Sequence, residues 1–306
     1  MRNQALRADF LMLITAMIWG SSFVAQRLGM DSIGPFLYSG LRFSLACLIL
    51  LPVIAFLEKR STRKPAPLNR GMLSGGIIMG LALAIGINLQ QVGLLFTSVT
   101  NSGFITGLYV IVVPILGLFF GQRSGMGIWL GASLAVVGMC LLSIGADFSV
   151  ASGDLLQLAG AVVWGIHVLV VGYFATRHDP LRLSLIQFAT CALISMLLSL
   201  LIETSSLEGI KAALPAILYG GIFGVAIGFT LQVVAQQHAI ASHAAIILSL
   251  EAVFAALAGT LFLGEMLSGR GYFGCALMFV GMLIAQLWPR PTPLTPAPVN
   301  AGAADR

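Results

Sequence analysis

Two short stretches of the chain decide its fold: Ala16-Met-Ile-Trp-Gly20 and Ala161-Val-Val-Trp-Gly165. The second stretch repeats the first at an offset of 145 residues, and each lies inside a long apolar run. Similarity at a fixed offset is typical of a chain built from duplicated units. The sequence therefore predicts two similar halves, residues 8–145 and 154–288.

Other motifs keep the same order in both halves. The offset of 145 also pairs Arg42-Phe43 with Gln187-Phe188. Further along, an offset of 143 pairs Gly121-Gln122 with Gly264-Glu265. Because several motifs recur in one order, the similarity extends over the whole of each half rather than over one pentapeptide.

The composition indicates that lipid surrounds most of the protein. Hydrophobic residues make up 58% of the 306 residues, charged residues only 9%, and the mean hydropathy is +0.99. A soluble domain has about 25% charged residues. The net charge of +5 comes mainly from Lys and Arg in short loops. Such charges orient a membrane protein, so the expected partner is the bilayer and not a nucleic acid.

A helix needs about 20 mostly apolar residues to cross a bilayer. The loops between the apolar runs are too short for a soluble domain, and no Walker-type phosphate-binding motif is present. The sequence thus predicts an all-α integral membrane protein with ten transmembrane helices and no nucleotide-driven motor. The predicted spans are residues 8–28, 34–57, 71–95, 99–120, 126–145, 154–175, 181–202, 214–237, 243–263 and 269–288.

The positive charges favour one orientation of these spans. Twelve Lys and Arg residues fall on the side of the N-terminus, and three, Arg27, Lys211 and Arg270, fall on the other. Loops rich in Lys and Arg stay in the cytoplasm. We therefore expect both termini in the cytoplasm and the protein in a bacterial inner membrane. The Pro-rich segment 289–306 is predicted to be a disordered cytoplasmic tail.

Each half contains five predicted spans, and this odd number decides how the halves are related. The second half must enter the membrane from the opposite side, which makes an inverted repeat. Inverted repeats place a substrate site near the middle of the membrane and permit alternating access. Channels are also built on such repeats, so the repeat by itself leaves both a carrier and a channel open.

The motifs resemble EamA-type transporters of the drug/metabolite transporter superfamily. The two Ala-x-x-Trp-Gly stretches resemble the first span of each half in that family, and residues 41–43 resemble its second span. Residues 101–114 resemble the fourth span, and residues 244–254, followed by Leu-Gly-Glu at 263–265, resemble the ninth. The resemblance covers nearly everything but the tail.

This resemblance implies a carrier that works without ATP hydrolysis or a cofactor. Its relatives move small metabolites, amino acids or drug-like compounds, often outward. One position departs from the family pattern: many relatives have Glu-Pro in the ninth span, where this chain has Glu251-Ala252. Because a proline kinks a helix, the sequence leaves the bend of this span open. In the fourth span, Pro114 predicts a kink.

Two charged residues, Arg42 and Glu251, lie deep within predicted spans, away from the span ends. Charges at membrane depth are costly and usually face the interior of a bundle. Glu251 either titrates a proton or holds a cation, or it orients helices as a structural group. Arg42 either contacts Glu251 from the other half or extends its long stem toward the membrane surface. We consider both residues as candidates for ion or proton coupling.

The matched tryptophans are candidates for substrate contacts. Trp19 and Trp164 lie well inside their spans, where they form either the walls of a pocket or close helix contacts with the indole N–H bonded locally. His167 follows Trp164 by three residues and shares its helix face. It either touches substrate or relays a proton, or it is a buried histidine that packs the core.

Several uncharged polar residues also lie deep in the predicted spans. Amides can bind a polar substrate, and they can also hold membrane helices together. Most of them fall in the third, fourth and eighth spans, which suggests a polar path through the bundle. The candidates that we select for substrate binding are Asn88, Gln90, Asn101 and Gln232.

The sequence argues against an enzyme. It has no HExxH motif and no grouping that suggests catalytic residues, and no cluster has the spacing of metal ligands. The four cysteines lie in apolar runs without CxxC spacing, so they are expected to pack as small apolar residues. We expect a secondary transporter of a small molecule; a channel or a non-transporting membrane receptor is the alternative. The sequence leaves open whether two copies of the chain form a homodimer.

Overall fold

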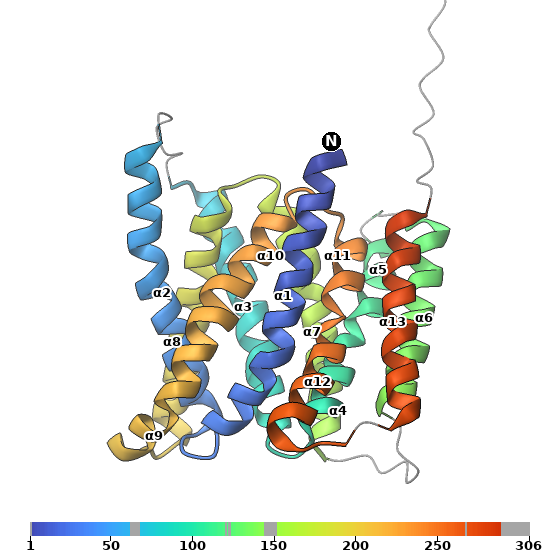
Figure 1. Ribbon diagram of the computed structural model, residues 1–306. Coiled ribbons are helices and arrows are strands. Elements are labelled where there is room, and N and C mark those ends of the chain that lie inside the picture. Colours follow the sequence, from blue (N-terminus) through green and yellow to red (C-terminus); the bar gives the residue numbers. More distant parts are fainter. Residues whose placement is uncertain are drawn as a thin grey trace, which may run out of the picture.

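The structure is a computed structural model that describes residues 2–61, 68–119, 121, 124–143, 152–266 and 268–288. Every regular element in these residues is a helix, and Figure 1 shows the helices side by side in one bundle. The predicted all-α class is confirmed for this part of the chain, and the predicted tail at 289–306 lies outside it. The helices are α1 (Arg2–Gly29), α2 (Pro35–Arg60), α3 (Arg70–Leu94), α4 (Val99–Gly107), α5 (Tyr109–Phe119), α6 (Met126–Ser143), α7 (Ser152–Ala175), α8 (Pro180–Ile202), α9 (Leu207–Tyr219), the π-helix η1 (Gly220–Phe229), α10 (Thr230–Ala235), α11 (Ala241–Leu248), α12 (Glu251–Leu263) and α13 (Gly269–Leu287).

Local sequence explains where many of these helices begin. The first backbone N–H groups of a helix lack partners within the helix, and Ser, Asn or Asp just before it can accept from them. In α2 and α8 a proline also occupies the first position, where its missing N–H costs nothing. Side chains that cap a first turn are those of Asn69, Ser98, Asp179, Ser206 and Ser268.

The lengths and surfaces of the helices fit a membrane. Within the described residues, eight helical segments are long and apolar enough to cross a bilayer, and two shorter apolar helices cover Met126–Leu141 and Gly269–Ala285. Large apolar side chains point outward, such as Leu201 at 81% exposed and Phe262 at 72% exposed. A soluble protein rarely exposes so much apolar surface. The chain is therefore a multi-pass membrane protein.

Two of the apolar segments are broken near their middle. One breaks at Leu108, between α4 and α5, and the other at Ser249-Leu250, between α11 and α12. Pro114 lies inside α5, so the break in this segment is six residues before the predicted position. In the other segment the Ser249 hydroxyl donates to the Ile246 carbonyl at 2.8 Å. A break therefore forms next to Glu251 without the proline that many relatives have.

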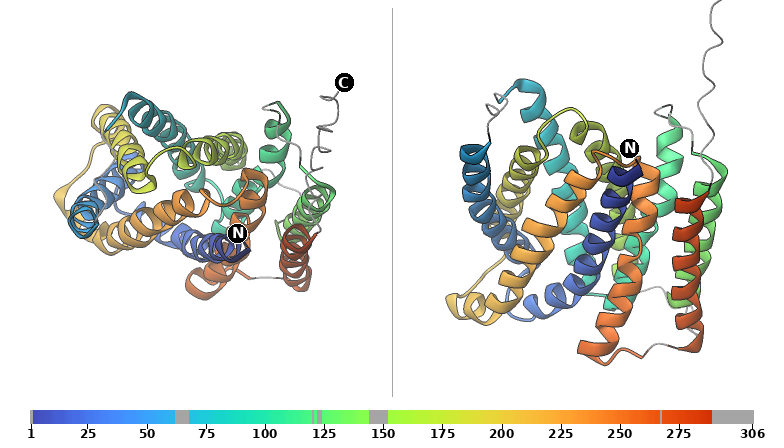
Figure 2. Two further views of the ribbon diagram at one scale, coloured as in Figure 1. Left: turned by 90° about the horizontal axis from the view of Figure 1, so that it is seen from above. Right: turned by 45° about the horizontal axis from the view of Figure 1, so that its top comes forward.

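The two halves of the chain are interleaved. Helix α2 packs against α8, α3 against α7 and α8, α1 against α12, and α6 against α13. Seen from above, α6 and α13 form a pair at one edge of the bundle (Figure 2, left). Each of these pairs combines a helix from before residue 145 with one from after it. The centre of the bundle is thus built by both halves.

Candidate functional site

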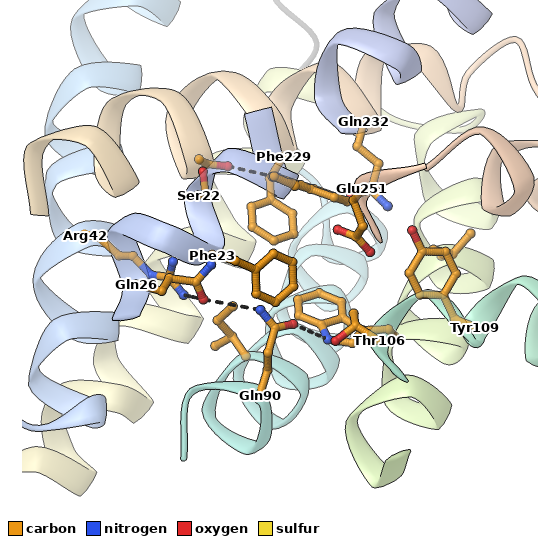
Figure 3. Close-up of a pocket in the computed structure, with 15 residues that line it drawn as sticks. Ser22, Phe23, Gln26, Arg42, Gln90, Thr106, Tyr109, Phe229, Gln232 and Glu251 are labelled. Carbon is orange, nitrogen blue, oxygen red and sulfur yellow. Dashed lines mark hydrogen bonds between the residues drawn. The ribbon is translucent and has the colours of Figure 1, made fainter. Parts of the chain in front are cut away.

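A narrow cavity with a volume of about 30 Å³ lies in the middle of the bundle (Figure 3). Helices α1, α2, α3 and α7, the π-helix η1, α10 and α12 all contribute to its lining. Six of the residues selected from the sequence line this one cavity: Trp19, Arg42, Gln90, Trp164, Gln232 and Glu251.

Aromatic rings form the wall of the cavity. The Phe229 ring lies 4.5 Å from Trp19 and 5.9 Å from Trp164, measured between ring centroids, and its plane is within 19° of that of Trp164. The Trp164 indole N–H donates to Gln90 Oε1 at 3.0 Å, and the Trp19 indole N–H donates to the Gly224 carbonyl at 3.0 Å. The two tryptophans therefore face the same space from opposite halves of the chain.

The π-helix brings Phe229 and the neighbouring backbone close to α1. Such helices are rare and often occur at functional sites. A Cβ atom at Gly228 would lie 2.6 Å from Trp19 Nε1, and one at Gly224 would lie 3.0 Å from Ser22 Oγ. Glycine at these two positions lets α1 and η1 approach closely, so that Trp19 can reach the Gly224 carbonyl.

One end of the cavity carries a positive charge. The Arg42 side chain is buried, and its guanidinium donates to the amide oxygens of Gln91 at 3.3 Å and Gln26 at 3.5 Å. The guanidinium carbon also lies 5.1 Å from the centroid of the Tyr38 ring. Arg42 Nε has no hydrogen-bond partner in the described part of the chain. The charge is thus held by amide oxygens and a ring face rather than by a carboxylate.

A chain of side-chain amides connects this end to the aromatic wall. Gln90 Nε2 donates to Gln26 Oε1 at 3.3 Å, while Gln90 Oε1 accepts from Trp164. Gln157 Nε2 donates to the Gln90 carbonyl at 2.9 Å, and Gln157 Oε1 accepts from the Thr106 hydroxyl at 3.3 Å. Gln90 is therefore fixed by both halves of the protein and orients Trp164.

The other end of the cavity carries a negative group. Glu251 is 3% exposed, and its Oε1 atom has no hydrogen-bond partner among the described residues. The same holds for both amide atoms of Gln232 and for the Tyr109 hydroxyl. In Figure 3 the Tyr109 hydroxyl and the Gln232 amide point toward the Glu251 carboxylate. This end therefore gathers a buried carboxylate, an amide and a hydroxyl, and the Tyr109 and Glu251 side chains interact with each other.

Arg42 and Glu251 do not form the ion pair hypothesised from the sequence. The ion pairs between described residues join Arg182 to Glu58 and Asp9 to His243. Figure 3 shows Arg42 and Glu251 on different sides of the Phe23 ring. The two charges therefore lie at separate ends of one cavity.

Three other residues selected from the sequence lie outside the lining. Asn88 Nδ2 donates to the Ala84 carbonyl at 2.8 Å and to Ser195 Oγ at 2.9 Å, which links α3 to α8. Asn101 is half-buried in the first turn of α4. His167 is buried behind the wall, where its Nε2 lies 3.1 Å from Gln187 Oε1 and its ring packs edge-on against Trp164.

The structure adds lining residues that were not selected from the sequence. Ser22, Phe23 and Gln26 follow Trp19 by three, four and seven residues, which is the spacing of one helix face. Because that spacing can be read from the sequence, these three residues could have been predicted to share the Trp19 face. Phe229 is different, because the π-helix changes the periodicity that places it toward the cavity.

The fold and cavity define a class: a multi-pass helical membrane protein with a polar and aromatic cavity at its centre. The sequence matches the EamA-like transporter family twice, over residues 6–144 and again over residues 151–286. The chain belongs to this family. One solved crystal structure has the same fold, with a TM-score of 0.76 at 20% sequence identity over 92% of this chain and 98% of the other.

Curated relatives are named as transporters. The chain is 30% identical to an uncharacterized transporter of Archaeoglobus fulgidus over 92% of its own length and 86% of that protein. It is 28% identical to the uncharacterized inner membrane transporter YedA of Escherichia coli, over 68% of each chain. It is also 30% identical to a probable amino-acid metabolite efflux pump of Escherichia coli, over 50% of each chain. These names support a membrane transporter.

Proposed function

We propose that this chain is a secondary transporter, in the export direction, for a small metabolite, amino acid or drug-like compound. The substrate binds in the central cavity, and the cavity opens to the two faces of the membrane in turn. The observation that carries this proposal is the cavity itself. It is buried at the centre of a membrane transporter fold, it is lined from both halves, and it has charged groups at its two ends.

The moving parts in this proposal are two inverted repeats of five spans each, residues 8–145 and 154–288. The pairing of helices supports them: α2 packs against its counterpart α8, and α6 packs against its counterpart α13. The separate match of each half to the family supports the same division. In such a scaffold, two copies related by a pseudo-twofold axis can rock around a fixed central site.

The orientation in this proposal follows the charges of the loops. Both termini lie in the cytoplasm, because Lys and Arg gather on that side. The membrane is a bacterial inner membrane, which agrees with the name of the relative YedA. Arg42 and Glu251 stay the candidates for coupling to an ion or proton, since they share the cavity with the substrate and can compete with it.

Counterflow in liposomes tests the proposal. Purified protein is reconstituted into liposomes loaded with unlabelled amino acids, and radiolabelled amino acids are added outside at low concentration. A carrier gives a saturable, transient accumulation of label. Flux that does not saturate and shows no accumulation would indicate a channel. Saturable binding without flux would indicate a receptor.

A further inference from the structure

One ion pair joins the first helix to a half-helix that leads to the cavity. His243 Nε2 lies 2.9 Å from Asp9 Oδ1, and the two side chains are 4% and 11% exposed. Asp9 lies near the start of α1, and His243 is the third residue of α11. Figure 1 shows α1 between α10 and α11 in the part of the bundle where the chain begins. The pair therefore holds α11 to α1 at this face of the membrane, which is cytoplasmic in the proposed orientation.

Helix α11 is short and ends at a break. It has eight residues, and no side chain caps its first turn. At its inner end the chain breaks at Ser249-Leu250, directly before Glu251, which lines the cavity. Hinges in moving proteins are often a few residues at the end of an element, as here. The contacts at the outer end of α11 therefore decide whether it stays against α1.

The ion pair is one of two side-chain contacts at this outer end. The other joins the Ser242 and Ser124 hydroxyls at 3.1 Å. A neutral imidazole can bond a carboxylate through one N–H, and an imidazolium adds a full charge. Charge-assisted hydrogen bonds are about twice as strong as neutral ones, and histidine is the side chain that ordinarily changes charge between pH 5 and 8. A proton on His243 thus strengthens the contact between α11 and α1.

Asp9 is the acidic group that contacts His243 among the described residues. Helix α11 packs against α1, α5, α6, α7 and α13. At the same face of the membrane, Arg7, Tyr173 and His238 are exposed, and Arg2 precedes Asp9 by seven residues. The other titratable residues of the packed helices lie in the middle of the bundle or toward the opposite face: Arg27, Tyr109, Cys140, Asp154, His167, Arg270, Tyr272 and Cys275.

The corresponding half-helix of the other half, α4, is held differently. An offset of 143 residues makes Thr100 the counterpart of His243. The Ser98 side chain caps the first turn of α4, and the Glu265 carboxylate accepts from the backbone N–H groups of Val99 and Thr100, each at 3.1 Å. Helix α4 is thus held through its backbone, and α11 through a side-chain pair that contains a histidine. A response to protons is expected at one face of the membrane only.

From this geometry we infer that the Asp9–His243 contact is a proton-sensitive latch, which holds α11 against α1 and closes the cavity toward the face where the chain begins. Acidification favours the latched arrangement, because the charged pair attracts more strongly than the neutral one. Loss of the proton weakens the latch, so that α11 can move about the break before Glu251. The inference rests on the proposed function, because it adds a regulation to the same transport cycle.

Access to the cavity from this face tests the latch. In a parent chain with its four native cysteines replaced, a membrane-impermeant maleimide labels Ser22→Cys from this face of oriented vesicles. The labelling rate is compared with that of the same chain carrying His243→Gln, because both share one thiol and the pH dependence of the thiol cancels. We expect similar rates at pH 8 and labelling of the parent about fivefold more slowly at pH 5.5. A ratio that does not change between the two pH values overturns the inference.

Two further variants assign the effect to this pair. Asp9→Asn removes the carboxylate and keeps His243, and it is expected to lose the pH response, so the test remains if His243→Gln does not fold. His238→Gln is the matched control, because this exposed histidine lies five residues before His243 and should leave the response unchanged. Persistence of the response in Asp9→Asn, or its loss in His238→Gln, would assign it to other groups and overturn the latch.

The outcomes separate this inference from the proposed function. If labelling responds to pH through Asp9 and His243 but no compound gives counterflow in liposomes, the latch stands and the transport proposal fails. If counterflow is observed while the labelling ratio does not respond to pH, the transport proposal stands and the latch fails.

Discussion

Helices α2 and α8 occupy matching places in the two halves, yet their first turns are held differently. The Asp179 carboxylate, just before α8, accepts from the backbone N–H of Arg182 at 2.9 Å. The first turn of α2 has no such local cap. There the Glu203 carboxylate, which follows α8, accepts from the backbone N–H groups of Phe36 and Leu37, each at 2.8 Å. One helix is capped from its own half and the other from the opposite half.

A single position explains this difference. Gly34 precedes α2 where Asp179 precedes α8, at the same offset of 145 residues. A Cβ atom at Gly34 would lie 2.2 Å from Glu203 Cδ. Only glycine leaves room for the carboxylate to reach the start of α2. At α8 the Asp179 side chain occupies the corresponding place.

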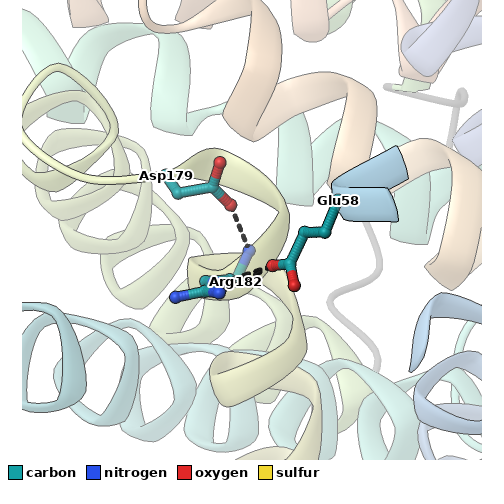
Figure 4. Close-up of polar contacts among 3 residues, drawn as sticks. All are labelled: Glu58, Asp179 and Arg182. Carbon is teal, nitrogen blue, oxygen red and sulfur yellow. Dashed lines mark hydrogen bonds and ion pairs between the residues drawn. The ribbon is translucent and has the colours of Figure 1, made fainter. Parts of the chain in front are cut away.

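The glutamates themselves also correspond. Glu58 and Glu203 are separated by the offset of 145 residues that relates the two tryptophans. Because the start of α8 is already capped, Glu58 accepts from the Arg182 side chain instead, from Nη2 at 2.7 Å and from Nε at 3.0 Å (Figure 4). Both glutamates thus connect α2 to α8, one at each end of the pair, through different chemistry.

Under the proposed repeat, the comparison teaches that the halves share their scaffold and differ in their polar groups. Trp19 and Trp164 match, and they build the common wall of the cavity. Arg42 has Gln187 as its counterpart, and at an offset of 143 Glu251 has Leu108 as its counterpart. The two charged ends of the cavity therefore lie where the halves diverge, and selectivity for substrate is expected there.

The largest effect is expected from making the halves alike at Arg42. The substitution Arg42→Gln introduces the residue of its counterpart and leaves Glu251 as the charged residue of the cavity. Transport should fall by about 100-fold, because the cavity loses the buried positive charge at one of its ends. Initial rates of counterflow measure this, with lipid-facing Leu200→Ala as the control. Near-wild-type transport by Arg42→Gln would mean that the charge at this end has no role in substrate binding.

The second-largest effect, a loss of stability, is expected at the start of α2. Gly34→Ala should displace Glu203 and remove two charge-assisted hydrogen bonds, which destabilises the protein by about 2–3 kcal/mol. Asp179→Ala removes one local cap and should cost about 1 kcal/mol. Gly269→Ala is the matched control, because nothing lies within 4 Å of a Cβ atom there. Thermal unfolding in detergent measures all three; equal losses for Gly34→Ala and Gly269→Ala would refute the contact with Glu203.

Substitution of the two tryptophans should affect different properties, substrate affinity for Trp164 and thermal stability for Trp19. Trp164→Phe frees Gln90, whose side chain lines the cavity, and should weaken substrate binding by about tenfold, or about 1.4 kcal/mol. Trp19→Phe removes the hydrogen bond that joins α1 to the Gly224 carbonyl of the π-helix, so its main effect should be on thermal stability. Titration of the best-binding ligand, together with melting curves, separates the two effects. Equal changes in affinity and stability would show that the indole N–H groups have one common role.

The smallest effect is expected at Glu58. Its ion pair with Arg182 lies near the surface, with side chains 34% and 21% exposed. Such pairs contribute about 0–1 kcal/mol and are screened by salt. Glu58→Gln should therefore lower stability by less than about 1 kcal/mol, and the loss should shrink in high salt. Glu203→Gln should cost more, and a reversed order would contradict the difference between the two ends of α2 and α8.

Much of this architecture is readable from the sequence, for physical reasons. The apolar runs and the lack of charge predict helices in a membrane, and the recurring Trp-Gly pairs predict halves with a shared wall. The spacing from Trp19 to Gln26 also encodes one lining face of the cavity. In contrast, Asn88 and Gln90 are both amides of α3. Only the packing of neighbouring helices directs Asn88 to Ser195 and Gln90 to the cavity.

Other features depend on tertiary contacts and have no local signal. The π-helix η1 changes the helical period, so the position of Phe229 cannot be read from a regular pattern. The contact of Glu203 with the start of α2 joins residues that are 166 and 167 positions apart. In the sequence, Gly34 before Pro35 indicates only that α2 has no local side-chain cap. That the Glu203 carboxylate takes this role follows only from the three-dimensional structure.

Access to the cavity from each face of the membrane tests the central claim most directly. Ser22 lines the cavity and is 2% exposed. In a variant whose four native cysteines are replaced, Ser22→Cys is labelled with a membrane-impermeant maleimide, applied from one face or the other of oriented vesicles. We predict labelling from both faces, slowed in each case by the compound that gives counterflow. Labelling from one face only, or at a rate that a transported compound does not change, would contradict alternating access at this site.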